Sequence, residues 1–170
     1  MASQEALSVF ATGLKNAHAM EMQALSILKP QVKRIEHYPD LKARMEQHVA
    51  ETEGQIARLE TVFDRIEEHH SGFKDMVLSM GGTMAALGHA AAGDEILKDV
   101  FANYAFEHYE IAAYKSLLQL SDQTMTSETS ALLQQSLDEE ERMAEWLDEH
   151  VGLITSQYLA LRENDETAKR

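Results

Sequence analysis

Apolar residues recur every three or four positions along the first part of the chain. The spacing of Leu7, Phe10, Leu14 and Ala17 is typical of a helix with one buried face. Pro30 is expected to kink or end this helix, because proline lacks the N–H that a helix interior needs. The pattern therefore predicts one long amphipathic helix at the start of the chain.

A turn and a second long helix follow. In the stretch HYPDLK (residues 37–42), Pro39 disfavours a helical conformation at Tyr38, and Asp40 can cap the next helix. The 3,4 spacing of apolar residues then continues to about His70. The first two helices are expected to form an antiparallel pair.

The second half of the chain repeats this plan after a connector. Residues 73–93 are rich in Met and Ala and predict one or two short helices. Asp94 caps a third long helix, which ends near Asp122, and a fourth begins near Ser127. Two long helices are therefore expected in this half as well.

The lengths of the links decide the topology. Short links join the helices within each pair, whereas about 21 residues separate the two pairs. The second and third helices must then run parallel, with a connector that climbs the bundle. This predicts an all-α, ferritin-like four-helix bundle with one long crossover that carries an extra short helix. Residues 1–162 form a single domain, and the charged residues 163–170 are expected to form a frayed tail.

Composition narrows the possible functions. The chain has no cysteine, which excludes disulfides, thiolate metal sites and iron–sulfur centres. Its 29 Asp and Glu against 15 Lys and Arg argue against direct nucleic-acid binding. The N-terminus lacks the pattern of a signal peptide, and no apolar stretch is long enough to span a membrane. A cytoplasmic protein is expected.

Each long helix interrupts its apolar face with glutamate. Any one of these residues alone is an ordinary half-exposed side chain at the edge of a stripe, but four helices with the same interruption are hard to explain by coincidence. Glu21 and Glu51 are 30 residues apart, as are Glu110 and Glu140, so each pair of helices places its carboxylates at a similar depth. The residues in question are Glu21, Glu51, Glu107, Glu110 and Glu140.

Five carboxylates in a bundle core would repel one another and lose their hydration. No Lys or Arg lies on the same stripes to neutralise them, and Glu139 falls off the stripe on what reads as a solvated face. Hard carboxylate oxygens suit iron or manganese, and the i, i+3 spacing of Glu107 and Glu110 lets both reach one cluster. The sequence therefore predicts a metal site with two ions.

Three histidines lie near these glutamates. His48, one turn before Glu51, is either a further ligand or a hydrogen-bond partner that orients Glu51. His18 corresponds to Glu107 if the two helical pairs are related by duplication. His108 falls off the stripe and fits a structural role or a dimer contact better.

Four stretches of the chain resemble the YciF-type family of bacterial ferritin-like proteins, which occur in stress-associated gene neighbourhoods. The resemblance implies a ferritin-like bundle, commonly a homodimer, with a dinuclear metal site. It also supports the same five glutamates as ligands. The stretches are AMEMQ (19–23), HVAETEGQIARLETVF (48–63), EHYEIAAY (107–114) and SLDEEE (136–141).

The chain departs from better-known diiron bundles at two positions. In rubrerythrins and bacterioferritins, a histidine follows the glutamates of the second and fourth helices by three residues. Here those positions hold Gly54 and Met143. The resemblance thus implies a centre richer in carboxylate, and it leaves oxygen activation open.

Two kinds of function remain. The first is a metal-binding protein with two iron ions per chain, or manganese, that acts in stress through iron oxidation or peroxide chemistry. If it is a diiron oxidoreductase, electrons must come from a donor protein or from ferrous iron. The second is a non-catalytic dimeric bundle that keeps a vestigial acidic site. Mineral storage is a weaker third reading, because it would require a closed cage.

Overall fold

The computed structural model of the protein describes residues 4–69, 93–124, 127–164 and 166–169. No strand occurs in these ranges, so the all-α prediction is confirmed. Four long helices account for nearly all of these residues: α1 (Gln4–Arg34), α2 (Pro39–His69), α4 (Glu95–Thr124) and α5 (Ser127–Glu163).

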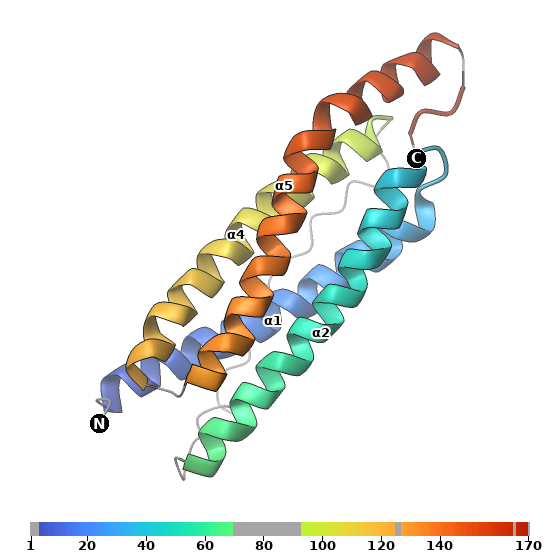
Figure 1. Ribbon diagram of the computed structural model, residues 1–170. Helices are drawn as coiled ribbons and strands as arrows, with labels where there is room; N and C mark the ends of the chain where they lie inside the picture. Colours follow the sequence, from blue (N-terminus) through green and yellow to red (C-terminus); the bar gives the residue numbers. More distant parts are fainter. Residues whose placement is uncertain (1–3, 70–92, 125–126, 165, 170) are drawn as a thin grey trace.

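The helices form a four-membered bundle. Helix α1 packs against α2 and α4, and α5 packs against α4 and α2, which closes the ring. Helices α2 and α4 run in the same direction, opposite to α1 and α5 (Figure 1). This is the direction that a one-crossover topology requires. The crossover itself and its expected short helix lie outside the described residues. None of the described helices is long and apolar enough to cross a membrane.

Two helix starts show how the sequence sets the boundaries. The N–H of Lys42 bonds to the carbonyl of Tyr38 (2.9 Å), so Pro39 occupies the first helical position of α2, where its missing N–H costs nothing. Asp40 therefore lies in the first turn and is not the capping residue that the sequence predicts. At α4, the N–H of Lys98 bonds to the carbonyl of Asp94 (3.2 Å), which agrees with the predicted start.

Pro30 does not end α1, which continues to Arg34. The proline is exposed, so its ring faces solvent and displaces no packed neighbour. The turn beyond it is anchored because Nε of Arg34 lies 2.6 Å from Oε1 of Glu95 on α4.

The tail after α5 is held against the bundle, in contrast to the frayed tail that its charge predicts. The hydroxyl of Tyr38 donates to the carbonyl of Ala168 (2.7 Å), and Ala168 is buried. The N–H of Ile96 bonds to the carbonyl of Lys169 (3.2 Å). The sequence does not reveal these bonds because their partners are backbone groups distant along the chain.

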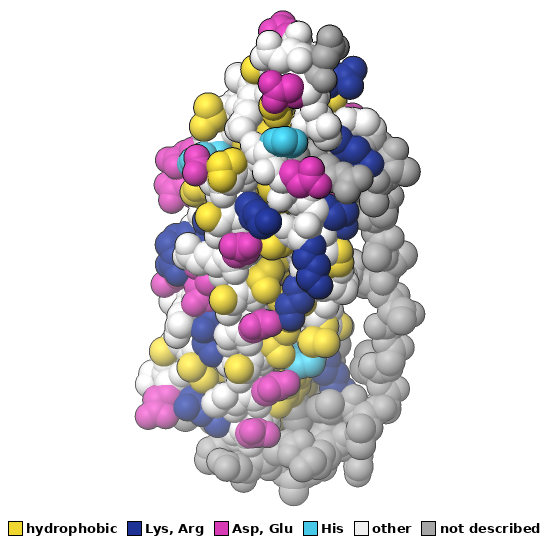
Figure 2. All heavy atoms as spheres, turned by 90° about the vertical axis from the view of Figure 1, so that its right-hand side faces the viewer, with side chains coloured by type: hydrophobic (Ala, Val, Ile, Leu, Met, Phe, Trp, Pro, Cys, Tyr) yellow, Lys and Arg dark blue, Asp and Glu magenta, His cyan; other side chains and the backbone are white. Residues whose placement is uncertain are grey.

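The described side of the bundle that α2 occupies carries a mixed surface. Basic and acidic side chains alternate over it, with scattered apolar residues between them (Figure 2). Such a mixed pattern neutralises itself locally and creates no strong field of one sign.

Buried apolar residues form two clusters, one toward each end of the bundle. The first includes Phe10, Leu14, Leu59, Tyr114 and Leu133. The second includes Leu28, Leu41, Met45, Val100 and Leu147.

Candidate metal centre

A layer of charged side chains crosses the bundle between the two apolar clusters. Each helix contributes to it at the level where its residues pass from one cluster to the other. On α1, Met20 belongs to the first cluster and Ala24 to the second, and Glu21 lies between them. The layer contains Glu21 from α1, His48 and Glu51 from α2, Glu107 and Glu110 from α4, and Glu140 from α5.

Four of these residues converge closely. One ligand atom from each of His48, Glu107, Glu110 and Glu140 lies within 4.8 Å of the others. None of the four residues is more than 2% exposed. We call this group the central cluster. It is a place where side chains from three helices could hold a metal ion.

The carboxylates of the layer are short of hydrogen-bond donors. Among the described residues, five buried oxygen atoms find no hydrogen-bond partner: Oε2 of Glu21, Oε2 of Glu107, Oε1 of Glu110 and both oxygens of Glu140. Buried polar atoms without partners are rare in folded proteins, and each costs free energy. Buried carboxylate oxygens without donors are the ligands that a hard cation prefers once the carboxyls have lost their protons, so the residues fit a metal site.

His48 connects the cluster to Glu51. Its Nε2 lies 3.3 Å from Oε1 of Glu107 and 3.7 Å from Oε2 of Glu140, and its Nδ1 lies 3.2 Å from Oε2 of Glu51. Burial lowers the pKa of His48, but the charge of Glu107 and the bonds to Glu107 and Glu51 outweigh it and raise the pKa to about 9. The imidazole thus lies between the carboxylates of Glu51, Glu107 and Glu140.

Glu21 borders the central cluster. The hydroxyl of Tyr114, which is itself buried, donates to Oε1 of Glu21 at 2.6 Å. Burial raises the pKa of Glu21 to about 7, although this bond and the charge of His48 oppose the shift. Its second oxygen is one of the five unpartnered atoms and remains available to a cation.

Glu51, like Glu21, is a predicted carboxylate ligand that lies outside the central cluster. Arg44 donates to its Oε2 (2.9 Å) and Gln47 to its Oε1 (2.8 Å). Burial raises its pKa, but the bonds from His48, Arg44 and Gln47 prevail and lower it to about 2. The side chain is 14% exposed, more than any member of the cluster. Its position is set by Arg44, which sequence reasoning did not include.

Two carboxylates of the cluster favour the protonated form. Burial raises the pKa of Glu110 well above its usual value, and the charges of Glu21 and Glu107 add to the shift. Burial and the charges of Glu110 and Glu107 do the same for Glu140. Like charges in a dry interior cannot all ionise unless a cation accompanies them.

Two arginines of α2 contradict the expectation that no cation accompanies the carboxylates. Arg44 pairs with Glu51, and Arg58 pairs with Glu139. Glu139 is buried, whereas the sequence predicts that it lies on a solvated face. Arg44 lies seven residues before Glu51, and Arg58 lies seven residues after it. This spacing puts all three on one face of α2, so it could have predicted that the arginines lie near Glu51.

These arginines do not neutralise the carboxylates of the central cluster through ion pairs. Among the described residues, no Lys or Arg forms an ion pair with Glu107, Glu110 or Glu140, and only His48 does so. One imidazolium could neutralise only one of these carboxylates if all three were ionised. A multivalent cation would balance the remainder.

A family model described as a domain of unknown function, DUF892, matches residues 5–160. The chain belongs to this family. It is also similar to a protein from Xanthomonas campestris whose crystal structure is known. The two sequences are 34% identical, the match covers 94% of this chain and 99% of that one, and the TM-score is 0.73.

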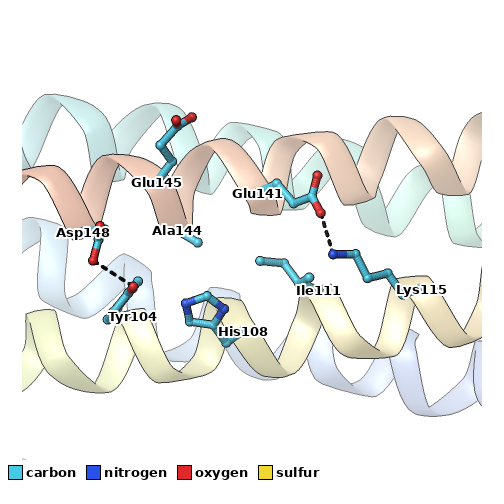
Figure 3. A pocket seen from close by; sticks show the side chains of 8 residues that line it. All are labelled: Tyr104, His108, Ile111, Lys115, Glu141, Ala144, Glu145 and Asp148. Carbon is cyan, nitrogen blue, oxygen red and sulfur yellow. Dashed lines mark hydrogen bonds and ion pairs between the residues drawn. The ribbon is translucent and has the colours of Figure 1, made fainter.

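The other two histidines that the sequence singled out in this DUF892 chain lie apart from the cluster. Nε2 of His18 lies 3.5 Å from Glu60, and its ring contacts the edge of Phe63. His108 is exposed and packs against Tyr104 in a groove between α4 and α5 (Figure 3). Neither is among the residues that the structure brings together.

The two positions that lack histidine are explained by their surroundings. Met143 is fully buried and belongs to the second apolar cluster. A Cβ atom at Gly54 would approach Nη1 of Arg58 to 3.4 Å. This part of the layer is thus occupied by apolar packing and by a guanidinium group, and the cluster depends on His48 for its imidazole.

Proposed function

We propose that this chain is a ferritin-like metal-binding protein with a carboxylate-rich, dinuclear iron centre. The observation that carries the proposal is the set of five buried carboxylate oxygens that have no hydrogen-bond partner in the described part of the chain. Burying several carboxylates without a counter-charge costs several kcal/mol each, and a pair of multivalent ions removes this cost. Hard carboxylate oxygens suit iron, with manganese as a chemically similar substitute, and the resemblance to YciF-type proteins supports a dinuclear site.

The residues have distinct tasks in this proposal. Glu107, Glu110, Glu140 and His48 supply ligand atoms, and Glu21 adds an oxygen while Tyr114 orients it. Glu51 orients His48 through its contact with Nδ1. When bound, iron would supply redox chemistry toward ferrous iron or peroxide. Because the chain has no cysteine, electrons would come from a partner protein or from ferrous iron itself.

Metal analysis tests the proposal. We expect about two iron ions per chain after loading under anaerobic conditions. The double variant Glu110→Gln with Glu140→Gln should lose this binding. Glutamine resembles the protonated carboxyl that these sites favour without metal, so the variant should remain folded. The matched control is Glu46→Gln with Glu163→Gln, which removes two exposed charges and should bind as the wild type does.

Thermal unfolding gives a second readout of the same binding. Iron at about a hundred times its Kd should stabilise the wild type by about 2.7 kcal/mol, which raises Tm by roughly 5–10 °C. A chelator should reverse the shift, and the double variant should not respond. Unchanged metal content in the double variant would refute the assignment of the site.

A non-catalytic bundle is the second candidate. Its support is the raised pKa of Glu110 and Glu140, because protonated carboxyls allow the layer to stay buried without metal. In that case Tm would be the same with iron and with chelator.

We expect the protein to act as a homodimer in the cytoplasm, in a bacterial stress response. Sedimentation would test the dimer and would also reveal the closed cage that mineral storage requires. Iron-limited and peroxide-treated cells that lack the protein would test the role in stress.

A further inference from the structure

The central cluster is closed to solvent, so a cation needs a route to it. Its four residues are at most 2% exposed, and Glu21 beside them is fully buried. Two surface cavities of similar volume lie along α5. One, of 440 Å³, lies between α4 and α5, and the other, of 410 Å³, lies between α2 and α5.

The groove between α4 and α5 does not continue into the centre. Tyr104 bonds to Asp148, and Lys115 pairs with Glu141, so both pairs bridge the two helices (Figure 3). Between these pairs, Ile111 and the buried Ala144 face each other, and both belong to the first apolar cluster. A cation would have to pass through packed carbon atoms there.

The cavity between α2 and α5 is linked to the site through two side chains on its wall. Its lining includes Arg44 and Gln47, and these two residues hold the two oxygens of Glu51 (2.9 and 2.8 Å). Glu51 in turn contacts His48, whose other nitrogen faces Glu107. An unbroken series of polar side chains therefore leads from this cavity to the central cluster.

We propose that the α2–α5 cavity is the entrance for the metal ion and that Glu51 is the residue that passes the ion inward. Resting on the function proposed above, this inference concerns how the centre is filled. In the observed arrangement Arg44 and Gln47 hold Glu51 away from the cluster. When a cation reaches the cavity, Glu51 leaves these donors, binds the ion and rotates toward His48. Arg44 therefore keeps the entrance closed.

The wall of the cavity carries charges of both signs. Glu145 and Glu149 offer carboxylate oxygens to a cation at the mouth, and Arg142 on the same wall balances part of their charge. Arg44 opposes the last step twice, because it repels a cation and occupies an oxygen of Glu51. Removing Arg44 should therefore speed metal binding, whereas removing the charge of Glu51 should slow it.

The test measures the rate at which Co²⁺ binds. Stopped-flow quenching of the intrinsic fluorescence reports association, and transfer to excess EDTA reports release. A hydrogen bond to a charged group is worth enough that its loss changes a rate by about tenfold. Arg44→Gln should bind Co²⁺ about tenfold faster than the wild type, and Glu51→Gln about tenfold slower. Arg44→Gln should reach the wild-type amount of bound metal at saturation, because the cluster ligands and Glu51 are intact.

Lys115→Gln is the matched control, since it removes a basic partner from the other cavity. Its association rate should stay within about twofold of the wild type, as for most exposed substitutions. If Arg44→Gln does not fold, Arg44→Lys keeps the charge, loses the fork of donors and should show a smaller acceleration.

The outcomes separate this inference from the proposed function. Wild-type rates in both α2 variants, with full metal binding, would overturn the entrance while the metal centre stands. Acceleration by Lys115→Gln alone would place the route between α4 and α5 and would also overturn it. A wild type that binds no Co²⁺ and no iron would refute the metal centre and the entrance together.

Discussion

Glu21 and Glu51 show how one neighbour decides what a carboxylate can do. Both interrupt an apolar stripe, and both were predicted as ligands from the same periodicity. Tyr114 gives Glu21 one neutral donor and leaves its second oxygen unpartnered, whereas Arg44 and Gln47 hold both oxygens of Glu51. The first side chain is available to a cation in place, and the second must move.

Tyr114 can be tested by removing its hydroxyl. Tyr114→Phe leaves Glu21 buried without its donor, so we expect a loss of about 1.5 kcal/mol in the free energy of unfolding, measured by urea denaturation of metal-free protein at pH 8. Tyr104→Phe is the control on the same helix. It loses an exposed bond to Asp148 and should cost less than about 0.5 kcal/mol. Equal losses in the two variants would mean that the buried bond to Glu21 stabilises the fold no more than the exposed bond to Asp148 does.

The candidate site could be predicted only in part from the sequence. Periodicity finds side chains that face inward, and it correctly placed Glu107, Glu110 and Glu140 in one buried layer. It places Arg58 on the same face of α2 as Glu51, but it does not reveal the pairing of Arg58 with Glu139, because two long side chains at the edge of a stripe can fold inward together. Burial of a charge depends on its partner, and the partner lies on another helix.

The four long helices were the most predictable level of the structure. The 3,4 spacing and the turn around Pro39 predicted the four long helices and the start of α2 within two residues. The end of α1 was less predictable, because the sequence does not show that the ring of Pro30 faces solvent. Boundaries depend on single residues, whereas a long apolar face depends on many.

Helices α1 and α4 approach closely at Gly13. A Cβ atom there would lie 2.9 Å from Cδ2 of Leu117, which is buried. Overpacking of this kind costs about 1–3 kcal/mol, more than the roughly 1 kcal/mol that alanine gains over glycine in a helix. Gly13→Ala should therefore lower the free energy of unfolding by about 1 kcal/mol, measured by urea denaturation.

Gly152 provides the matched control on α5. Nothing lies within 4 Å of a Cβ atom at that position, so Gly152→Ala should gain stability by about 0.5–1 kcal/mol. The same substitution should therefore lower the free energy of unfolding at Gly13 and raise it at Gly152. A gain at Gly13 as well would mean that Leu117 moves aside at little cost and that the contact between α1 and α4 is loose.

At the scale of the whole molecule, Glu95 joins parts of the chain that are far apart in sequence. It is buried, and it pairs with Arg34 at the end of α1 (2.6 Å) and with Lys169 in the tail (3.3 Å). The end of the bundle near the α1–α2 turn is therefore tied to the start of α4 and to the C-terminal residues (Figure 1). A charged tail that was expected to fray is held by this one carboxylate and by backbone bonds.

Substitution of Glu95 tests this anchor and its dependence on pH. Burial raises the pKa of Glu95, but the bonds and charges of Arg34 and Lys169 lower it below its usual 4.5. A lowered pKa adds stability that is fully present above pH 4.5 and is lost as the pH falls through the folded-state value. Glu95→Gln should cost about 2 kcal/mol at pH 7, or roughly 4–8 °C in Tm.

The difference in Tm between Glu95→Gln and the wild type should shrink below pH 4.5, because the wild-type carboxyl then becomes neutral too. Glu128→Gln is the control, since Glu128 also lies in the first turn of a helix but is 82% exposed, 3.9 Å from Arg65. That variant should match the wild type at every pH. A Glu95→Gln deficit that persists unchanged in acid would mean that the carboxylate's shape, and not its charge, holds the tail against the bundle.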